Sequence, residues 1–209
     1  MFTGIIKEIG KFRAIRKTSH GIELSVDAKI INKNIDIGDS IAVNGVCLST
    51  TKNDKYLVFD AVKNTIDGTN LKRLIVGSSV NLENALKMGD DISGHMVSGH
   101  IDGERKIINN KKTPNGWSLD IEITETDKRY LVPKGSVAID GVSLTVGDIS
   151  SRYIRIFIIP HTLESTTLKS KKVGAYINIE FDMLFKKNVS KTSFESKVSM
   201  DSLHQKGFA

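Results

Sequence analysis

The chain has 209 residues, of which 39% are hydrophobic and 26% are charged, and this length suffices for two small domains. Its formal net charge of +6 comes from lysines that alternate with acidic residues, a pattern typical of a solvated surface. No basic stripe is interleaved with aromatic residues, which argues against a nucleic-acid-binding protein and leaves an anionic small-molecule ligand open.

The N-terminal segment, from Met1 to Glu8, lacks the basic region and the long apolar run of a signal peptide. No apolar stretch approaches the ~20 residues that cross a bilayer. The single cysteine, Cys47, excludes an internal disulfide and fits a reducing compartment. We therefore expect a soluble, cytoplasmic protein.

Short segments rich in β-branched residues predict the strands of an all-β protein. The turn dipeptides Asn44-Gly45 and Asp140-Gly141 stand between apolar runs, as in β-hairpins. With about six short strands in each half of the chain, we expect two small closed barrels. The predicted strands cover residues 22–26, 40–43, 56–59 and 80–82, and then 118–123, 136–139, 153–159 and 176–179.

Short helical segments are predicted between the strands. They lie at residues 27–35 and 69–75 in the first half, and at 126–131 and 166–172 in the second half. Gly77 and Gly174 follow the later segment of each half and are predicted to cap it. The boundary between the halves falls in the glycine- and aspartate-bearing stretch 87–94.

The tail that follows Asp182 has apolar residues at loosely helical spacing. These residues are Phe185, Val189, Phe194, Val198 and Leu203. An amphipathic helix needs a partner that covers its apolar face. Self-association of the chain is the favoured hypothesis, and packing of the helix against its own barrel is the alternative.

The sequence repeats itself with a period of one small domain. The segment Ser40–Ser49 recurs 96 residues later as Ser136–Thr145, and Met1–Gly4 recurs 95 residues later as Met96–Gly99. This period is too long for a solenoid unit and implies two like domains with two like pockets. The predicted boundaries are 1–95 for an N-terminal barrel, 96–184 for a C-terminal barrel and 185–209 for a helical tail.

Two side chains on the strand after each turn are candidates for chemistry. Side chains two apart on a strand share a face, so Cys47 lies with Ser49, and Ser143 lies with Thr145. Each pair of thiol or hydroxyl groups faces either the core of its barrel or a ligand pocket. The sequence leaves both alternatives open.

The halves differ where Ile5 in the first corresponds to His100 in the second. His95 and His100 are five residues apart, but this spacing matches no standard metal-ligand motif and Cys47 is far away in the sequence. We therefore predict no metal site, and we expect His95 to be a surface or structural histidine. His100 is either a surface or structural histidine or a proton-handling group, because imidazole titrates near neutral pH.

The segments 60–65 and 157–162 are equivalent strand ends that run into a helical turn. Backbone groups exposed there could hydrogen-bond a flat polar ring. Thr65 and Thr162 are alternatively helix caps. Lys134, which follows Pro133, is either solvated or reaches an anionic group.

Five segments are informative as a set: Met1–Ile6, Asn44–Leu48, Gly94–Ile101, Asp140–Val146 and Ile159–Glu164. Together they resemble the riboflavin synthase family, over residues 1–183. The resemblance implies two six-stranded antiparallel Greek-key barrels, each able to bind 6,7-dimethyl-8-ribityllumazine, and a homotrimer held by C-terminal helices. It implies that no metal or redox cofactor is required.

The implied activity is a dismutation of riboflavin biosynthesis. One lumazine gives a four-carbon unit to a second lumazine, and riboflavin and 5-amino-6-ribitylamino-uracil are formed, which makes the protein a transferase. Association with lumazine synthase, the enzyme that makes the substrate, is left open. The alternative function is a non-catalytic lumazine- or flavin-binding chromophore protein, which needs only one competent pocket. A purely structural double barrel is the third hypothesis.

The resemblance also implies ligand contacts at matching positions. In the first barrel these are Gly4, Ile5, Ile6, Cys47, Leu48, Ser49, Asp60, Ala61, Val62, Lys63, Asn64 and Thr65. In the second barrel they are Gly99, His100, Ile101, Lys134, Ser143, Leu144, Thr145, Ile158, Ile159, Pro160, His161, Thr162 and Leu163. Ser40 matches a family position near the active site, and Ser49 stands where a threonine is common.

Identical reactants explain a duplicated barrel, whereas their different roles, carbanion and electrophile, require the halves to differ. His100 is the candidate proton shuttle, and Cys47, helped by Ser40, would add to or position water at C7 of the acceptor. Ser143 and Thr145 would hold the donor. We expect a working site to join the first barrel of one chain to the second barrel of another, and so to bring Cys47 and His100 together across chains.

Overall fold

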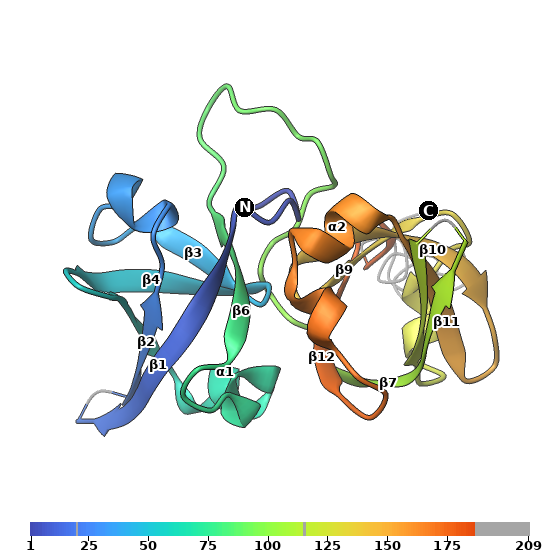
Figure 1. The fold of residues 1–209 in the computed structure, drawn as a ribbon, viewed down its shortest axis with the longest axis horizontal. Helices are drawn as coiled ribbons and strands as arrows, with labels where there is room; N and C mark the ends of the chain where they lie inside the picture. The colour runs from blue at the N-terminus through green and yellow to red at the C-terminus, as the bar shows by residue number, and fades with distance from the viewer. Residues whose placement is uncertain (20, 115, 187–209) are drawn as a thin grey trace, which may run out of the picture.

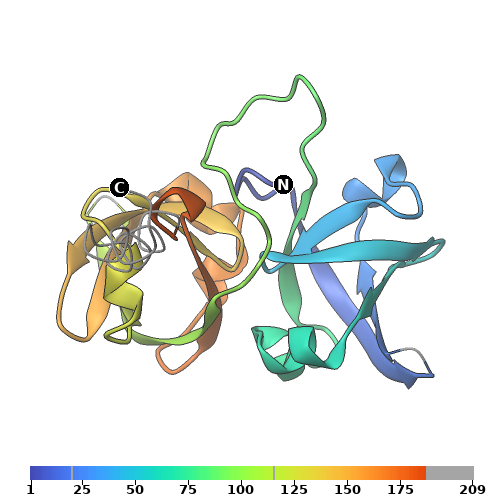
Figure 2. The same cartoon turned by 180° about the vertical axis from the view of Figure 1, so that it is seen from behind.

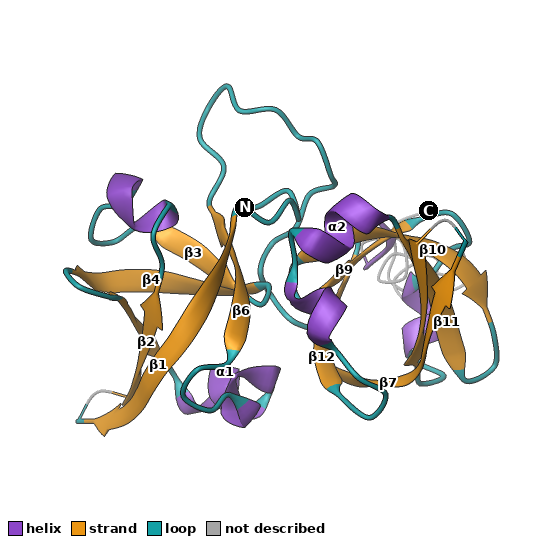
Figure 3. Ribbon diagram, viewed as in Figure 1, coloured by secondary structure: helices purple, strands orange, loops and turns teal. Residues whose placement is uncertain are grey.

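The computed structural model describes residues 1–19, 21–114 and 116–186. Within these residues two closed β-barrels lie side by side, coloured blue to green and yellow to orange in Figure 1. The view from behind shows the chain passing between them in the green segment (Figure 2). Strands form the wall of both barrels, and the helices are short pieces at their ends (Figure 3). The all-β, two-barrel prediction is confirmed.

The first barrel contains six antiparallel strands: β1 (Glu8–Thr18), β2 (Gly21–Asp27), β3 (Ser40–Val43), β4 (Val46–Asn53), β5 (Leu57–Ala61) and β6 (Ser79–Asn84). Their order around the barrel is β1-β2-β5-β4-β3-β6, and β6 pairs with β1 to close it. Tight connections join β3, β4 and β5 in succession, while β2 lies beside β5. This arrangement is a Greek key.

The second barrel repeats that order. Its strands are β7 (Gly103–Thr113), β8 (Gly116–Glu122), β9 (Ser136–Ile139), β10 (Val142–Ile149), β11 (Tyr153–Ile158) and β12 (Tyr176–Phe181). The hairpins after β3 and β9 turn at Asn44-Gly45 and Asp140-Gly141, all four residues with positive φ between 46° and 80°. A type I′ turn requires positive φ at both central residues, so the dipeptides act as predicted.

The helices are shorter than predicted. Four are single 3₁₀ turns: η1 (Ile31–Asn34), η2 (Asn70–Arg73), η3 (Asp127–Tyr130) and η4 (Thr167–Ser170). Gly77 and Gly174 do not cap η2 and η4, because the C-caps are Leu74 and Lys171. Each glycine instead has positive φ in the turn that leads into the next strand. Two further helices, α1 (Lys63–Asp67) and α2 (Pro160–Glu164), follow β5 and β11.

Each barrel has its own hydrophobic core. Alternate residues point inward, so that Val46, Leu48 and Thr50 on β4 are buried while Cys47 and Ser49 face outward. Phe12 and Phe59 fill the first core, whereas β-branched and leucine side chains dominate the second. The lumen of each barrel is therefore packed, and a ligand must bind on the outer wall.

A buried polar network joins the barrels. Asn81 Nδ2 donates to the carbonyl of Asp140, and Asn178 Nδ2 donates to the carbonyl of Asn44, each at 2.9 Å. The Asp140 carboxylate also pairs with Lys171 Nζ at 2.7 Å. Because unpaired buried polar groups are costly, this reciprocal pairing fixes the two barrels in one relative orientation.

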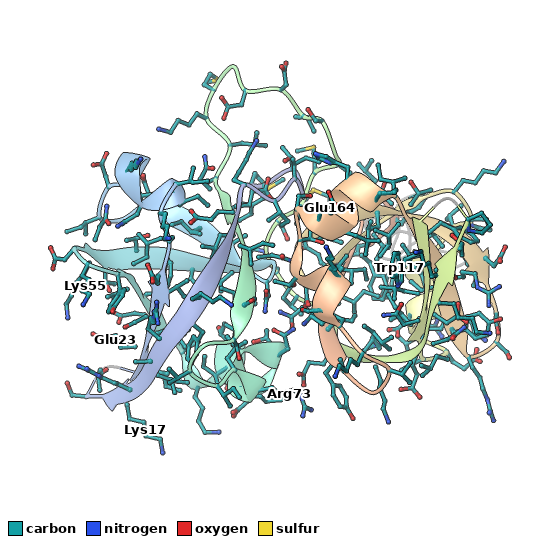
Figure 4. The ribbon with its side chains drawn as sticks, in the orientation of Figure 1. Lys17, Glu23, Lys55, Arg73, Trp117 and Glu164 are labelled. Carbon is teal, nitrogen blue, oxygen red and sulfur yellow. The ribbon has the colours of Figure 1, made fainter. Side chains whose placement is uncertain are left out.

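The edge of the interface carries charged contacts. Arg73, labelled between the barrels at the lower edge of Figure 4, extends from η2 toward the second barrel. Its Nε lies 2.8 Å from the Glu104 carboxylate, and its guanidinium carbon lies 3.9 Å from the centre of the Tyr176 ring. The exposed arginine therefore adds a polar rim to the buried network.

The described residues end in a single helical turn, at the point where the predicted tail segment starts. Asp182 accepts hydrogen bonds from the amides of Phe185 and Lys186, and Lys186 pairs with Asp102 at 2.6 Å. The rest of the predicted segment 185–209 lies outside the residues that the structure describes. Within the described ranges, no helix is long and apolar enough to span a membrane.

Candidate active site

The candidate hydroxyl and thiol groups lie on the outer walls of the barrels. In the first barrel, Ser40 on β3 pairs directly with Ser49 on β4, and Ser49 pairs with Asp60 on β5. Cys47, two residues from Ser49, is partly exposed on the same face. Four predicted site residues thus share one patch, and the pocket alternative is favoured over the core alternative.

The equivalent patch in the second barrel has Thr145 opposite Ser136, with Ser143 on the same face of β10. The strand neighbour that corresponds to Asp60 is Phe157, whose side chain is 57% exposed. An acidic group in the first pocket is therefore replaced by an aromatic ring in the second. The sequence repeat aligns Asp60 with Phe157, but it does not show that both residues lie beside the candidate patches.

A backbone segment from the opposite half covers each patch. The carbonyl of Gly99 accepts a hydrogen bond of 2.9 Å from the Cys47 amide, and the carbonyl of Gly4 accepts one of 2.8 Å from the Ser143 amide. The two segments meet at an antiparallel bridge between Phe2 and Val97. Each candidate pocket is therefore built from both halves of the chain.

This crossed arrangement corrects the predicted grouping of site residues. Gly4, Ile5 and Ile6 were expected in the first barrel's pocket, and Gly99, His100 and Ile101 in the second barrel's. Instead, each segment leads into its own barrel but packs on the other one. A Cβ on Gly4 would lie 2.6 Å from the Ser143 Cβ, and a Cβ on Gly99 would lie 2.5 Å from the Cys47 Cβ.

His100 consequently follows the residue that hydrogen-bonds Cys47 in the same chain. Within one chain, the backbone next to His100 therefore already contacts Cys47, whereas the working site shared between two chains stays a prediction. The sequence repeat did not reveal this contact, because it assigns each segment to the barrel it precedes, whereas the chain passes over to the neighbouring barrel before its first strand begins. His100 itself is exposed, and its amide donates to Ser98 Oγ at 3.2 Å.

His95, for which we expected a surface or structural role, contacts the candidate site on the second barrel with its ring. Its Nδ1 lies 2.7 Å from Ser143 Oγ, and its amide donates to the carbonyl of Thr3. Burial lowers the pKa of His95, and the negative charge of Asp182 opposes that change. The neutral imidazole is thus favoured beside a hydroxyl group. The sequence offered no signal for this contact, because the first half has no equivalent histidine.

Two buried glutamates hold the crossing segments, which are the stretches 3–6 and 98–101 that pack on the opposite barrel. Glu83 accepts hydrogen bonds from Thr3 and Gly4, and Glu180 accepts them from Ser98 and Gly99. Burial raises the pKa of the Glu83 carboxyl, while the hydrogen bonds from Thr3 and Gly4 lower it. Neither glutamate was identified from the sequence as part of the site.

The segments 60–65 and 158–163 form the ends of β5 and β11 and the helices α1 and α2. Val62 and Ile159 are the N-caps, so the cap alternative for Thr65 and Thr162 is wrong. The side chains of Val62, Lys63, Asn64, Ile159, Pro160 and His161 are exposed. Five other predicted contacts, Leu48, Ala61, Leu144, Ile158 and Leu163, have their side chains in the barrel cores.

Lys134 is exposed and has φ of 64°, in the left-handed region. Its amide donates to the carbonyl of Val146 at 2.8 Å, as the amide of Gly38 donates to Thr50 in the first barrel. The second barrel therefore keeps a lysine where the first has a glycine, at a backbone conformation that costs a lysine energy. Within the described ranges, no cluster of three or more His, Cys, Asp and Glu could hold a metal ion.

Comparison with known proteins gives the family. The family model described as "Lumazine binding domain" matches twice, at residues 3–85 and 98–182. The chain is 39% identical to the riboflavin synthase of Actinobacillus pleuropneumoniae over the whole length of both chains. It is 40% identical to that of Bacillus amyloliquefaciens, over 89% of this chain and 87% of the relative. The chain belongs to the riboflavin synthase family.

Solved structures of LumP share the fold of this chain. LumP complexed with riboflavin matches with a TM-score of 0.79 at 24% sequence identity, covering 87% of this chain and 99% of that one. LumP complexed with 6,7-dimethyl-8-(1'-D-ribityl) lumazine matches with a TM-score of 0.77 at 23% identity. At this identity the likeness concerns the fold alone.

Proposed function

We propose that the protein is a riboflavin synthase, a transferase that dismutates two molecules of 6,7-dimethyl-8-ribityllumazine into riboflavin and 5-amino-6-ribitylamino-uracil. The observation that carries the proposal is the pair of like pockets, each an outer-wall patch covered by a segment of the other half. Two copies of one reactant need two matching sites. Relatives named riboflavin synthase, at 39% and 40% identity, support the same reaction.

The first pocket takes the acceptor lumazine. Its ring lies on the patch formed by Ser40, Ser49 and Cys47, below the backbone of the segment that carries His100. Cys47 adds to, or positions water at, C7 of the ring, with Ser40 in support. His100 moves the proton, since an imidazole can both accept and donate one near neutral pH.

The second pocket takes the donor lumazine. Ser143 and Thr145 bind its polar edge, and Phe157 provides an apolar surface for the flat ring. His95, hydrogen-bonded to Ser143 Oγ, orients that hydroxyl group. The lumazine ring stabilises its own carbanion by delocalisation, so orientation of the two rings is the main task of the protein and can supply on the order of 7–11 kcal/mol.

The two pockets of different chains face each other in the working site. Helices α1 and α2 carry predicted ligand-contact segments of the two candidate pockets. In Figure 1, α1 lies at the lower side of the first barrel and α2 at the upper side of the second barrel. Two lumazines held at these helices in one chain would therefore lie on different sides of the molecule. We accordingly propose that the working site forms between chains. The family resemblance supports a cytoplasmic homotrimer held by its C-terminal segments, and it leaves an association with lumazine synthase open.

A non-catalytic lumazine- or flavin-binding protein is the second candidate, because the fold is shared with LumP. Incubation with 6,7-dimethyl-8-ribityllumazine distinguishes the two. We expect two lumazines to be consumed for each riboflavin and each pyrimidine formed, followed by absorbance and chromatography, without added metal or redox cofactor. Lumazine that is bound stoichiometrically and recovered unchanged contradicts the catalytic function.

A further inference from the structure

Two carboxylates in equivalent places stand behind the crossing segments. Glu83 lies on β6 and Glu180 on β12, the last strand of each barrel, and their residues are 2% and 3% exposed. Burying a carboxylate is costly unless it receives several hydrogen bonds. Each of these receives three, and all three come from the segment that covers the opposite barrel's pocket.

The hydrogen bonds match pair by pair. Glu180 accepts from the amide and hydroxyl of Ser98 at 2.7 Å and from the amide of Gly99 at 3.0 Å. Glu83 accepts from the amide of Thr3 at 2.7 Å, from its hydroxyl at 2.6 Å and from the amide of Gly4 at 3.0 Å.

The same two glycines also contact β4 and β10, the strands that carry Cys47 and Ser143. The amide of Gly99 points to Glu180, while its carbonyl accepts the Cys47 amide at 2.9 Å. The amide of Gly4 points to Glu83, while its carbonyl accepts the Ser143 amide at 2.8 Å. A single glycine therefore connects each carboxylate to the strand of the other barrel that carries Cys47 or Ser143.

We propose that Glu180 is a positioning residue that sets His100 over the Cys47 pocket, and that Glu83 is its counterpart that sets Ile5 over the Ser143 pocket. The hydroxyl of Ser98 extends the chain of contacts, because it donates to Glu180 and accepts the His100 amide at 3.2 Å. The kinetic part of this proposal rests on the proposed riboflavin synthase activity. The part that concerns pocket geometry does not.

The test compares Glu180→Gln with Glu83→Gln. Glutamine keeps the shape of glutamate but replaces one acceptor oxygen by an NH₂ donor, so one donor of the segment loses its partner. Because burial and hydrogen bonds match, both variants should lose similar stability in urea unfolding. A purely structural role predicts that all their other properties change in parallel as well.

Amide hydrogen exchange reports the geometry without any catalysis. We expect Glu180→Gln to speed exchange of the Cys47 amide and to leave the Ser143 amide as in the parent protein. Glu83→Gln should do the reverse. Equal acceleration of both amides in both variants, or of neither amide in either variant, overturns the proposal.

Kinetics with 6,7-dimethyl-8-ribityllumazine separate the two roles. We expect Glu180→Gln to lower kcat by on the order of 10- to 100-fold, as a displaced catalytic group does, and to remove the same limb of the pH–kcat profile that His100→Gln removes. Glu83→Gln should keep that limb and raise KM. Identical pH profiles and identical kcat-to-KM effects in the two variants contradict the proposal.

Ser98→Ala is a second variant, which tests the proposal even if Glu180→Gln does not fold. It leaves the Glu180 carboxylate in place and removes only the hydroxyl that links it to the His100 amide. We expect a loss of kcat in the same direction as in Glu180→Gln, but smaller, with unchanged exchange at Ser143. An unchanged kcat in Ser98→Ala overturns the link to His100. A parent protein that makes no riboflavin would refute the proposed function, and the exchange result would still decide the geometry.

Discussion

The pocket on the first barrel and the pocket on the second share a backbone frame and differ in their reactive groups. In both, a glycine with positive φ presses against the strand that follows a type I′ turn, and a buried glutamate holds that glycine. The first pocket combines a thiol with an exposed histidine. The second combines a serine with a half-buried histidine and has an exposed phenylalanine where the first has an aspartate. The two candidate pockets thus share their backbone frame and differ in the side chains for which we propose reactive roles.

The barrel interface differs in the same selective way. Asn81 and Asn178 make equivalent hydrogen bonds across it, but Asn44 on one side corresponds to Asp140 on the other. Of these two, Asp140 alone can form an ion pair, and its partner is Lys171. The shared hydrogen bonds set the pseudo-twofold arrangement, and the ion pair distinguishes the halves. The interface therefore shows that the duplicated barrels are similar without being interchangeable.

The strongest way to break the comparison is to push a crossing segment away from its pocket. In Gly99→Ala a Cβ would lie 2.5 Å from the Cys47 Cβ, and in Gly4→Ala it would lie 2.6 Å from the Ser143 Cβ. We expect either substitution to lower kcat/KM at least about 100-fold, because a small displacement at a reacting site suffices for that. Steady-state riboflavin formation measures the loss.

Gly38→Ala is the matched control. Gly38 has φ of 98°, but among the described residues no atom lies within 4 Å of the place that a Cβ would take, so alanine adds backbone strain without a clash. We expect a loss of about 1–2 kcal/mol in unfolding free energy and nearly normal turnover. Equal kinetic losses in Gly38→Ala and Gly99→Ala would show that strain, rather than the clash with the pocket, inactivates the protein.

A milder change makes the first pocket more like the second. Cys47→Ser places a hydroxyl where Ser143 stands in the other barrel, and we expect it to retain measurable turnover, with kcat lowered by no more than about 1000-fold, as loss of a single polarising group does. Cys47→Trp should abolish turnover, because the side chain is packed beneath Gly99. Complete loss of turnover in Cys47→Ser with unchanged lumazine affinity would indicate an obligate thiolate.

His95 distinguishes the second pocket by its pH dependence. Because burial lowers its pKa, the folded protein keeps His95 neutral at pH values where the unfolded chain, with a pKa of about 6.5, binds a proton. Stability is therefore lost as pH falls below about 6.5, with a slope of at most about 1.4 kcal/mol per pH unit from this residue. Urea unfolding between pH 7.5 and pH 5.5 measures the slope.

His95→Gln should flatten that slope, while His161→Gln, which changes an exposed histidine on α2, should leave it as in the parent protein. A slope that is the same in His95→Gln and the parent would mean that other groups produce the pH dependence.

The sequence predicted the fold well because local chemistry determines it. Asn44-Gly45 and Asp140-Gly141 require positive φ and so locate the hairpins, and the alternation along β4 and β10 places their side chains. The predicted helices were too long. Asp27 is the last residue of strand β2, and residues 28–30 and 74–75 lie outside the 3₁₀ turns η1 and η2. The repeat revealed two pockets, but it could not reveal which segment covers which one.

The features that could not be predicted are contacts between residues far apart in the sequence. Gly99 reaches Cys47 and Gly4 reaches Ser143 only because the barrels pack against each other, and no local pattern encodes that contact. Glu83 and Glu180 escaped notice for the same reason, because a glutamate on a strand is usually solvated and its buried partners are about 80 residues away. His95 was assigned a surface or structural role because its partner lies 48 residues further along the chain.

The smallest expected effect concerns Lys134, which occupies the place of Gly38 in the first barrel and has φ of 64°. Lys134→Gly relieves the left-handed strain but adds freedom to the unfolded chain, so we expect the unfolding free energy to stay the same or to rise by up to about 1 kcal/mol. If the lysine binds an anionic group of the ligand, KM for the lumazine should rise a few-fold at low salt and less at high salt, because salt screens exposed charges. Lys134→Asn is the control, since asparagine tolerates this conformation without carrying a charge. Were Lys134→Gly to stabilise the protein and leave KM unchanged at both salt concentrations, the lysine would be an ordinary solvated side chain, and the two pockets would differ only in the groups on their walls.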